Sequence, residues 1–239
     1  MSLPGARMFF ASRKAAPSAP TARDYVQSGL LAMWDGIENA GWGQHDAAAT
    51  SWKDLIGSRD ATVGSAGSWK DNALHCDGTT YGARCTTIYD GFRTLEACYL
   101  FNGATNGGAG FVAVVSSGNG NGVLISKNSG DFGFGYYAAS TYFSGGPAIG
   151  DAATVVGVWD ANPASNKNVA QYVNGVSITT TTGGNPGFGS GTAISFGARW
   201  DSARPIVADL HCVRLYDRAL TAAEVAANYA IDMARFNLT

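Results

Sequence analysis

Carboxyl and imidazole groups are the side chains of this sequence that could carry out hydrolytic chemistry. Glycan hydrolysis commonly needs two carboxyl groups in one site, one to donate a proton and the other to attack or to activate water. The glutamates are dispersed, and neither Glu38 nor Glu96 has an acidic residue two positions away. The histidines, His45, His75 and His211, lack an adjacent partner motif. We therefore predict no catalytic residue and a protein that is not an enzyme. A glycan hydrolase with an unrecognised site stays open as an alternative.

The cysteines do not have the spacing of a metal site. Cys76, Cys85, Cys98 and Cys212 form no C-x-x-C pair and have no nearby pair of histidines, so we expect no zinc site. We expect buried free thiols, which fit synthesis in the cytosol. A disulfide between Cys76 and Cys85 stays open as an alternative, because a turn at Asp77-Gly78 could bring the two together.

Aromatic residues in polar loops indicate a different chemistry, the binding of sugars. A flat aromatic face can stack on the C–H side of a sugar ring while nearby polar groups bond to its hydroxyls. Three stretches combine these residue types, and the candidate ligand-binding residues in them are Trp42, His45, Tyr137, Tyr142, Trp200 and Asp201. The alternative is that the tryptophans pack in the core. We expect core packing of Trp34, Trp52, Trp69 and Trp159, and leave it open for Trp42.

The composition favours one all-β domain. Among 239 residues there are 32 Gly, 10 Tyr and 11 Phe, and only 14% of the residues are charged. Many short strands joined by tight turns have this composition, whereas a helical protein carries more Glu, Lys and Leu. A net charge of −2 without a long basic run argues against a nucleic-acid partner. No apolar stretch approaches the ~20 residues that span a bilayer, and we find no secretion signal.

The first residues differ from the rest in composition. Pro4, Pro17 and Pro20 occur with Ala, Ser and four basic residues in the first 24 positions, which predicts an extended arm over residues 1–24. The folded domain is then expected over residues 25–239. The arm is either a disordered leader or an anchor that orders on a larger assembly, with residues 8–10 as its hydrophobic plug.

Short apolar runs between turn signals predict the strands of this domain. Residues 29–36 form the first core strand, and residues 37–60 form a long irregular excursion. Asn174-Gly175 is the strongest hairpin signal, because both residues tolerate the positive φ of a type I′ turn. We expect a meander of antiparallel strands over residues 94–102, 110–116, 122–126, 132–137, 154–159, 170–173, 176–180 and 193–198.

The chain closes with a strand and a helix. Val213 and Leu215 alternate with polar residues, which predicts a strand with one face largely buried. Thr221 and Glu224 form a capping box, in which each side chain accepts from the backbone N–H of the other residue, so a helix begins there. Its apolar stripe is expected to contain Val225, Ala226, Tyr229 and Met233.

Two motifs resemble the laminin-G-like and concanavalin-A-like jelly-roll domains of bacterial surface and phage proteins. They are the W-D-G-I-x-N-x-G and W-x-D-L-x-G pair in residues 34–57 and the closing V-R-L-Y-D-R-A-L of residues 213–220. The resemblance implies an all-β, two-sheet antiparallel jelly-roll sandwich with a short C-terminal helix. Laminin-G-like domains often hold calcium at the rim, where Asp35, Asp77 or Asp201 could contribute. Turn formation is the expected role of these aspartates, so we name no metal ligand and no cofactor.

The resemblance implies a recognition module, since such domains usually bind sugars or proteins. We expect a lectin-like protein that binds a glycan or host-surface polysaccharide, displayed on a phage virion or alternatively on a bacterial surface, with residues 1–24 contacting protein neighbours. The alternative is a structural virion protein, for capsid decoration or assembly, that binds no sugar.

Overall fold

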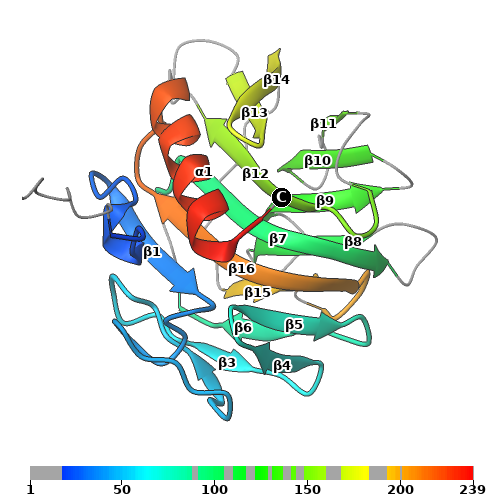
Figure 1. Cartoon of the computed structure of the whole chain (residues 1–239). Coiled ribbons are helices and arrows are strands. Elements are labelled where there is room, and N and C mark those ends of the chain that lie inside the picture. The colour runs from blue at the N-terminus through cyan, green and yellow to red at the C-terminus, as the bar shows by residue number, and fades with distance from the viewer. Residues whose placement is uncertain are drawn as a thin grey trace, which may run out of the picture.

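The computed structural model describes residues 18–87, 91–104, 110–116, 122–128, 131–136, 141–143, 148–159, 168–182, 193–199 and 201–238. These residues form two antiparallel sheets that pack face to face, with one helix on the outer face of the first sheet (Figure 1). The expected all-β sandwich with a short C-terminal helix is therefore confirmed. Within these ranges, no helix has the length and apolar character needed to cross a membrane.

The first sheet has the strand order β14-β13-β12-β7-β16-β5-β4, and β1 pairs with β16 beside this path. The long central strands β7 and β16 run antiparallel along most of their length, so they form the base on which the rest of this sheet is built. Its strands are β1 (Leu30–Asp35), β4 (Gly67–Lys70), β5 (Ala73–Asp77), β7 (Thr94–Ala104), β12 (Ala152–Trp159), β13 (Asn168–Val173), β14 (Val176–Thr182) and β16 (Ile206–Tyr216).

The second sheet has the order β11-β10-β9-β8-β15-β6-β3-β2. The core lies between the two sheets, where the Phe196 ring centroid is 5.1 Å from that of Trp34 and 5.2 Å from that of Trp52. Both tryptophans are fully buried, as expected. The strands are β2 (Ser51–Trp52), β3 (Ala61–Val63), β6 (Ala83–Cys85), β8 (Gly110–Ser116), β9 (Gly122–Asn128), β10 (Asp131–Tyr136), β11 (Thr141–Phe143) and β15 (Ala193–Phe196).

Every strand predicted from residue 94 onward is present, with small shifts of its ends. The meander is correct for β8 to β11 and for β12 to β14 but wrong elsewhere, because β7 lies between β12 and β16, and β15 lies between β8 and β6. The five strands β2 to β6 and the three-residue β11 were not predicted. Runs of two to five residues are too short to show a period of two.

The Asn174-Gly175 hairpin joins β13 to β14 as predicted. Asn174 has φ 52° and Gly175 has φ 76°, which are the two positive angles of a type I′ turn. The Asn174 side chain also accepts a hydrogen bond from the Thr154 amide at 3.0 Å, so the turn is attached to the neighbouring strand β12.

Strand β16 is buried on both faces, whereas one buried face was expected. The register shifts between Leu210 and Cys212, and a bulge of this kind turns the following side chains to the opposite face. Leu210, Val213 and Leu215 therefore all belong to the core between the sheets. Cys212 and Tyr216 point to the other side, under the helix.

Helix α1 (Ala222–Phe236) begins at the predicted capping box: the Thr221 amide donates to Glu224 Oε2 at 2.9 Å, and the Glu224 amide donates to Thr221 Oγ1 at 3.3 Å. Of the expected apolar stripe, Val225 is buried, but Ala226 is exposed and Tyr229 and Met233 are only partly buried. The buried helix residues are Val225, Asn228, Asp232 and Phe236, so two polar residues face the sheet where apolar ones were predicted.

These two polar residues belong to a buried network centred on Arg214 of β16. Its guanidinium donates to Asp232 Oδ1 at 2.7 Å and Oδ2 at 2.8 Å, and to Glu96 Oε2 at 2.7 Å. Asn228 donates to the same Glu96 oxygen at 2.8 Å, and Tyr25 donates to Asp232 Oδ1 at 2.7 Å. Burial opposes the charge of Arg214, but Asp232 and Glu96 outweigh it and raise the pKa of the guanidinium. We refer to these residues as the Arg214 network.

Ordered structure starts before residue 25. Ala22–Asp24 form a short 3-10 helix with Thr21 as its cap, and Ala22 is fully buried. The last residues assigned to the arm thus belong to the folded domain. The arm prediction for residues 1–17 lies outside the described residues.

We predict that Arg214→Met destabilises the protein by about 3–5 kcal/mol, because it leaves two carboxylates buried without their cation. Urea or thermal unfolding measures the change. The matched control is Arg218→Met, which removes a cation from the exposed ion pair with Glu224 and should cost about 1 kcal/mol or less. Equal losses in the two variants would contradict a structural role of the Arg214 network.

Candidate functional site

The long excursion between β1 and β3 folds into two neighbouring loops, and each is held by carboxylates that accept from backbone amides. In the second loop, Asp54 accepts from the amides of Met33 and Ile56 at 3.1 Å each and from that of Arg59 at 3.3 Å. A Cβ at Gly57 would lie 2.8 Å from Asp54 Oδ2, so a larger residue there would displace the carboxylate. The Asp and Gly of the W-x-D-L-x-G motif therefore shape this loop.

The first loop is held in the same way by Asp35 and Glu38. Asp35 Oδ1 accepts from the amides of Ile37 and Glu38 at 2.9 and 3.1 Å. Glu38 Oε2 then accepts from the Gly43 amide at 2.9 Å, which fixes the turn that carries Trp42. The W-D-G-I-x-N-x-G motif is thus a scaffold for the position of Trp42.

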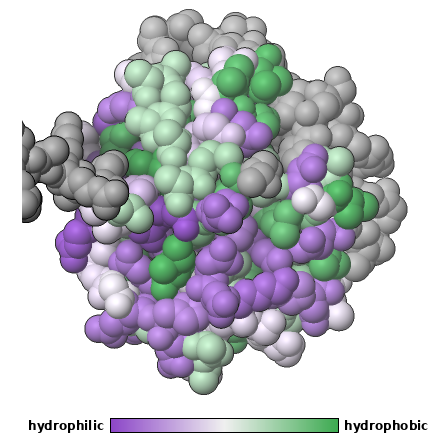
Figure 2. Space-filling view, viewed as in Figure 1, coloured by the Kyte–Doolittle hydropathy of each residue, from purple (hydrophilic) through white to green (hydrophobic). Residues whose placement is uncertain are grey.

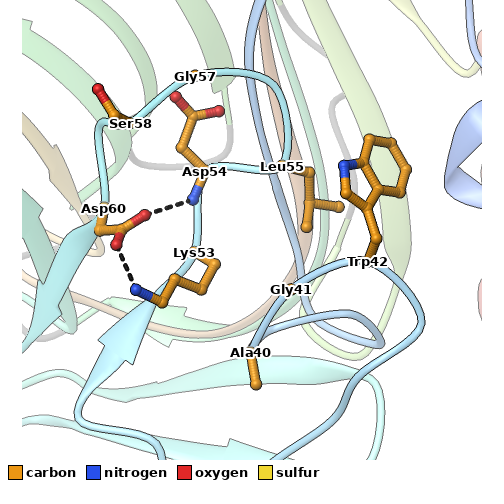
Figure 3. A pocket seen from close by; sticks show the side chains of 9 residues that line it. All are labelled: Ala40, Gly41, Trp42, Lys53, Asp54, Leu55, Gly57, Ser58 and Asp60. Atoms are coloured by element: carbon orange, nitrogen blue, oxygen red, sulfur yellow. Dashed lines mark hydrogen bonds and ion pairs between the residues drawn. The ribbon is translucent and has the colours of Figure 1, made fainter.

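Between the two loops lies a cleft of about 460 Å³. Figure 3 shows Trp42 on one side, Lys53 and Asp60 on the other, and Leu55 between them. Lys53 Nζ lies 2.5 Å from Asp60 Oδ2, and the two side chains are 46% and 35% exposed. We refer to it as the Trp42 cleft. Its lining residues are Ala40, Gly41, Trp42, Lys53, Asp54, Leu55, Gly57, Ser58 and Asp60.

Trp42 presents less of its ring than a stacking platform would. The indole is half-buried and packs against the apolar cluster under helix α1. The Arg23 guanidinium carbon lies 4.0 Å from the ring centroid, so one face of the ring is covered by a cation. In Figure 3 the indole nitrogen is turned toward Leu55. The residue therefore offers its edge and N–H to the cleft.

The other polar groups of the cleft suit hydroxyl binding better than acid–base chemistry. The Asp54 carboxylate already accepts from three backbone amides. Asp60 accepts from Lys53 and, at 3.1 Å, from the Asp54 amide. A hydrolytic pair needs one carboxyl group that donates a proton and one that attacks or activates water. The cleft offers instead the acceptor Asp60, the donor Lys53 and the hydroxyl of Ser58.

Of the six predicted binding residues, the structure places Trp42 in the cleft. His45 belongs to the same loop but is exposed, with Nδ1 3.2 Å from the Gly36 carbonyl, and does not line the cleft. Asp201 accepts from Arg199 Nε at 2.8 Å and from the Ala203 amide at 3.1 Å, in a turn of its own. Tyr137 and Trp200 lie outside the described residues. Tyr142 is in β11, opposite Gly133, and its side chain is not described.

Sequence reasoning missed Lys53, Ser58 and Asp60. All three lie in the excursion that contains Trp42, and the W-x-D-L-x-G motif marks their loop. That motif was the available signal, but it does not show which polar residues of two irregular loops converge.

The aspartates considered for calcium have turn-forming roles, as expected. Asp77 accepts from the Thr79 amide at 2.8 Å, and Asp35 and Asp201 accept from the backbone as described above. In the part of the chain that the structure describes, no three His, Cys, Asp or Glu residues are grouped to hold a metal. All four cysteines are buried free thiols, so Cys76 and Cys85 are not bridged.

A buried ion pair connects the cleft to the end of helix α1. Arg235 Nη2 donates to Asp35 Oδ2 at 2.8 Å and to Glu38 Oε1 at 3.4 Å. Burial raises the pKa of Asp35 to about 6, although Arg235 and the backbone amides act in the opposite direction. The two carboxylates that shape the Trp42 loop are therefore held by the helix.

Two antiparallel sheets in one sandwich, closed by a capped helix and with a polar cleft between rim loops, define a jelly-roll sandwich fold. The concanavalin A-like lectin/glucanases superfamily matches residues 93–226, which is more than half of the chain, and the protein belongs to this superfamily. No curated protein matches the chain.

Solved structures with the same fold come from larger proteins. A Trypanosoma rangeli sialidase in complex with 2,3-difluorosialic acid superimposes with a TM-score of 0.63 and 17% identity, over 89% of this chain and 33% of the sialidase. The botulinum neurotoxin type G receptor binding domain has a TM-score of 0.62 and 13% identity, over 85% of this chain and 51% of the toxin chain. This chain thus spans about a third of the length of the sialidases. At these identities the likeness establishes the fold alone.

We predict a pH dependence of stability that Asp35→Asn removes. The folded pKa of about 6 lies above the ordinary value near 3.9. Asp35 therefore contributes stability that is full below about pH 4 and is lost as the pH rises through about 6. Between pH 4 and pH 7 the wild type should lose up to about 3 kcal/mol relative to the Asn variant. Urea unfolding of both proteins at several pH values measures this difference, and parallel pH profiles would contradict the assignment.

Proposed function

We propose that this protein is a non-catalytic carbohydrate-binding module and that the Trp42 cleft binds a sugar. The observation that carries the proposal is the convergence, across one cleft, of an indole edge with the Lys53–Asp60 pair and Ser58. Each sugar hydroxyl both donates and accepts, so neighbouring hydroxyls fit an acceptor carboxylate beside a donor ammonium. Leu55 and the indole supply apolar contact for the ring carbons.

The charges of the cleft favour a neutral sugar. Lys53 and Asp60 cancel each other at 2.5 Å, and backbone amides surround the carboxylate of Asp54. An acidic sugar would place its carboxylate near Asp60, and the lysine that lines the cleft is already paired with that carboxylate. The fold is shared with sialidases, but the ligand that this cleft fits is a neutral hexose with adjacent hydroxyls.

The setting in which the module works is a further part of the proposal. The resemblance to phage and surface proteins, together with the proline-rich and basic composition of residues 1–24, supports attachment of the domain to a larger particle through this arm. A purely structural protein on such a particle would have no use for the polar cleft.

The cleft is tested by Asp60→Asn and Trp42→Ala in glycan arrays and calorimetry with the best neutral sugar. A hydrogen bond to a charged group contributes about 1.5–3 kcal/mol, so we expect Asp60→Asn to bind roughly tenfold to a hundredfold more weakly, and Trp42→Ala to bind more weakly because it loses the apolar contact of the indole. The fold should survive Asp60→Asn, because exposed ion pairs contribute about 1 kcal/mol or less. Unfolding curves check this.

Two matched controls use residues that the sequence suggested and the structure places elsewhere. His45→Ala changes the same loop outside the cleft, and Asp201→Asn changes a distant turn. Both should bind as the wild type does. Failure of every glycan on a broad array, or full affinity of Asp60→Asn, would overturn the proposal.

The arm is tested separately by deleting residues 1–17. We expect the truncated chain to keep its unfolding curve and its sugar affinity but to be lost from particles purified from the producing culture, as measured by mass spectrometry. Unchanged incorporation would exclude anchoring by this segment.

A further inference from the structure

The sheets of this sandwich end in strands of very different length. A strand at a sheet edge presents unpaired N–H and C=O groups to other chains, and proteins protect such edges by keeping them short or by placing charges on them. Among the described strands, β2, β11 and β4 are edges of two, three and four residues, and β4 carries the exposed Lys70. Strand β14 is an edge of seven residues. Strand β1, of six residues, also pairs with one strand only, but the loop at residues 54–55 bonds to its other side. Among the described strands, β14 is therefore the long edge without such protection.

The chemistry of β14 does not protect it. Its sequence, V-S-I-T-T-T-T, contains no charged residue, no proline and no glycine. Val176 and Ile178 are 63% and 45% exposed and, two positions apart in a strand, they lie on one face. They are two of the four large hydrophobic side chains found exposed in the described part of the chain. The edge is therefore long, uncharged and rich in β-branched residues, and no described strand pairs with its outer side.

In the described part of the chain, the surface beside β14 on helix α1 carries no unpaired charge. The charged residues of helix α1 are all engaged by their own chain, Glu224 by Arg218, Asp232 by Arg214 and Arg235 by Asp35. Its solvent side consists of alanines, Ala222, Ala223, Ala226, Ala227, Ala230 and Ala234. Gly175 joins the two elements, because a Cβ there would lie 3.3 Å from the Cα of Ala226. Figure 2 shows this pale and green region over α1 and the neighbouring hairpin, above a polar lower half.

We propose that a second copy of this chain covers this surface, with β14 of one protomer pairing antiparallel with β14 of its partner. Pairing about residue 179 sets residues 176 and 178 opposite residues 182 and 180 of the other copy, and no charges oppose each other because the strand contains no charged residue. A two-fold arrangement makes the contact self-complementary and closed. A charged or acidic peptide would find no complementary group on this edge.

The buried area that a stable interface needs is reached more readily with a second protomer than with a short peptide. A stable interface buries about 1,200–2,000 Å² in total, more than seven paired residues supply. The alanine face of α1 adds flat surface next to the strand, and small side chains let a partner approach closely. A second copy presents both elements in the matching order.

Dimer formation is a property separate from sugar binding, and it affects how strongly a polysaccharide is bound. In Figure 1 the loops of the Trp42 cleft lie at the opposite end of the molecule from β14. Both clefts of the dimer stay open, so the dimer can bind two sugars of one polysaccharide and gain avidity.

The test is the mass of the full chain in solution, measured by light scattering or analytical ultracentrifugation over a range of concentrations. We expect the wild type to have twice the mass of one chain, and Ile178→Lys or Val176→Lys to have the mass of one chain. The variants should keep the wild-type circular dichroism spectrum and the affinity of a single cleft, which shows that they are folded.

The matched control is Ile149→Lys, which places the same charge at a side chain that is 71% exposed and away from β14 in the sequence. It should remain dimeric. A wild type that stays monomeric at about 100 μM, or an Ile178→Lys variant as dimeric as the wild type, would overturn the proposal. Neither result bears on sugar binding by the monomer, so the two proposals fail independently.

Discussion

The burial of one guanidinium constrains most of this structure. Arg214 has no exposed surface, and a charge in that position is tolerated only with charged partners and complete hydrogen bonding. Asp232 of the helix and Glu96 of β7 supply the carboxylates. Since Asp232 can reach Arg214 in one position of the helix only, the network sets both the placement and the rotation of α1 on the sheet. An apolar stripe alone would leave the rotation less determined.

The same interaction reaches the candidate site through the last turn of the helix. With α1 fixed by Asp232, Arg235 lies one turn further on and meets Asp35 and Glu38. Those carboxylates fold the loop that carries Trp42. Tyr25 adds a second link, because it donates to Asp232 while its ring lies 4.1 Å below the Arg214 guanidinium carbon. Residues before the first strand, the last helix and the cleft therefore form one cooperative unit. A change under the helix would be felt at Trp42.

The features that could be predicted from sequence are those determined by local chemistry. The capping box of Thr221 and Glu224 and the positive φ angles of Asn174 and Gly175 depend on neighbours a few residues away, and both predictions are confirmed. Most of the buried face of α1 was not predicted, because hydrophobic periodicity detects apolar residues only. Asn228 and Asp232 are buried because they bond to Glu96 of β7 and to Arg214 of β16, which lie far from them in the sequence. Strand β16 was also predicted only in part, because its bulge between Leu210 and Cys212 places Leu210 and Val213 on the same face, which a period of two does not predict.

The candidate site was predicted in part for a related reason. Trp42 was found because its residue type carries a signal by itself. Lys53 and Asp60 carry no such signal, and their approach to Trp42 depends on how Asp54 and Asp35 fold two loops that lack secondary structure. Most described aspartates accept hydrogen bonds from backbone amides. A sequence motif does not distinguish that role from ligand binding.

The use of acidic residues also bears on the choice between binding and catalysis. In the described residues the buried carboxylates are committed to the fold: Asp35 and Glu38 to Arg235, Asp54 to backbone amides, Glu96 and Asp232 to Arg214, and Asp209 to Lys70 and His75. A carboxyl group that must lose and regain a proton in each turnover cannot at the same time hold a loop or a helix in place. Asp60 is the cleft carboxylate that lies partly in solvent, and it stands beside a lysine. One paired carboxylate can hold a hydroxyl, whereas glycan hydrolysis commonly uses two carboxyl groups in one site, and this difference supports the proposal that the cleft binds a sugar.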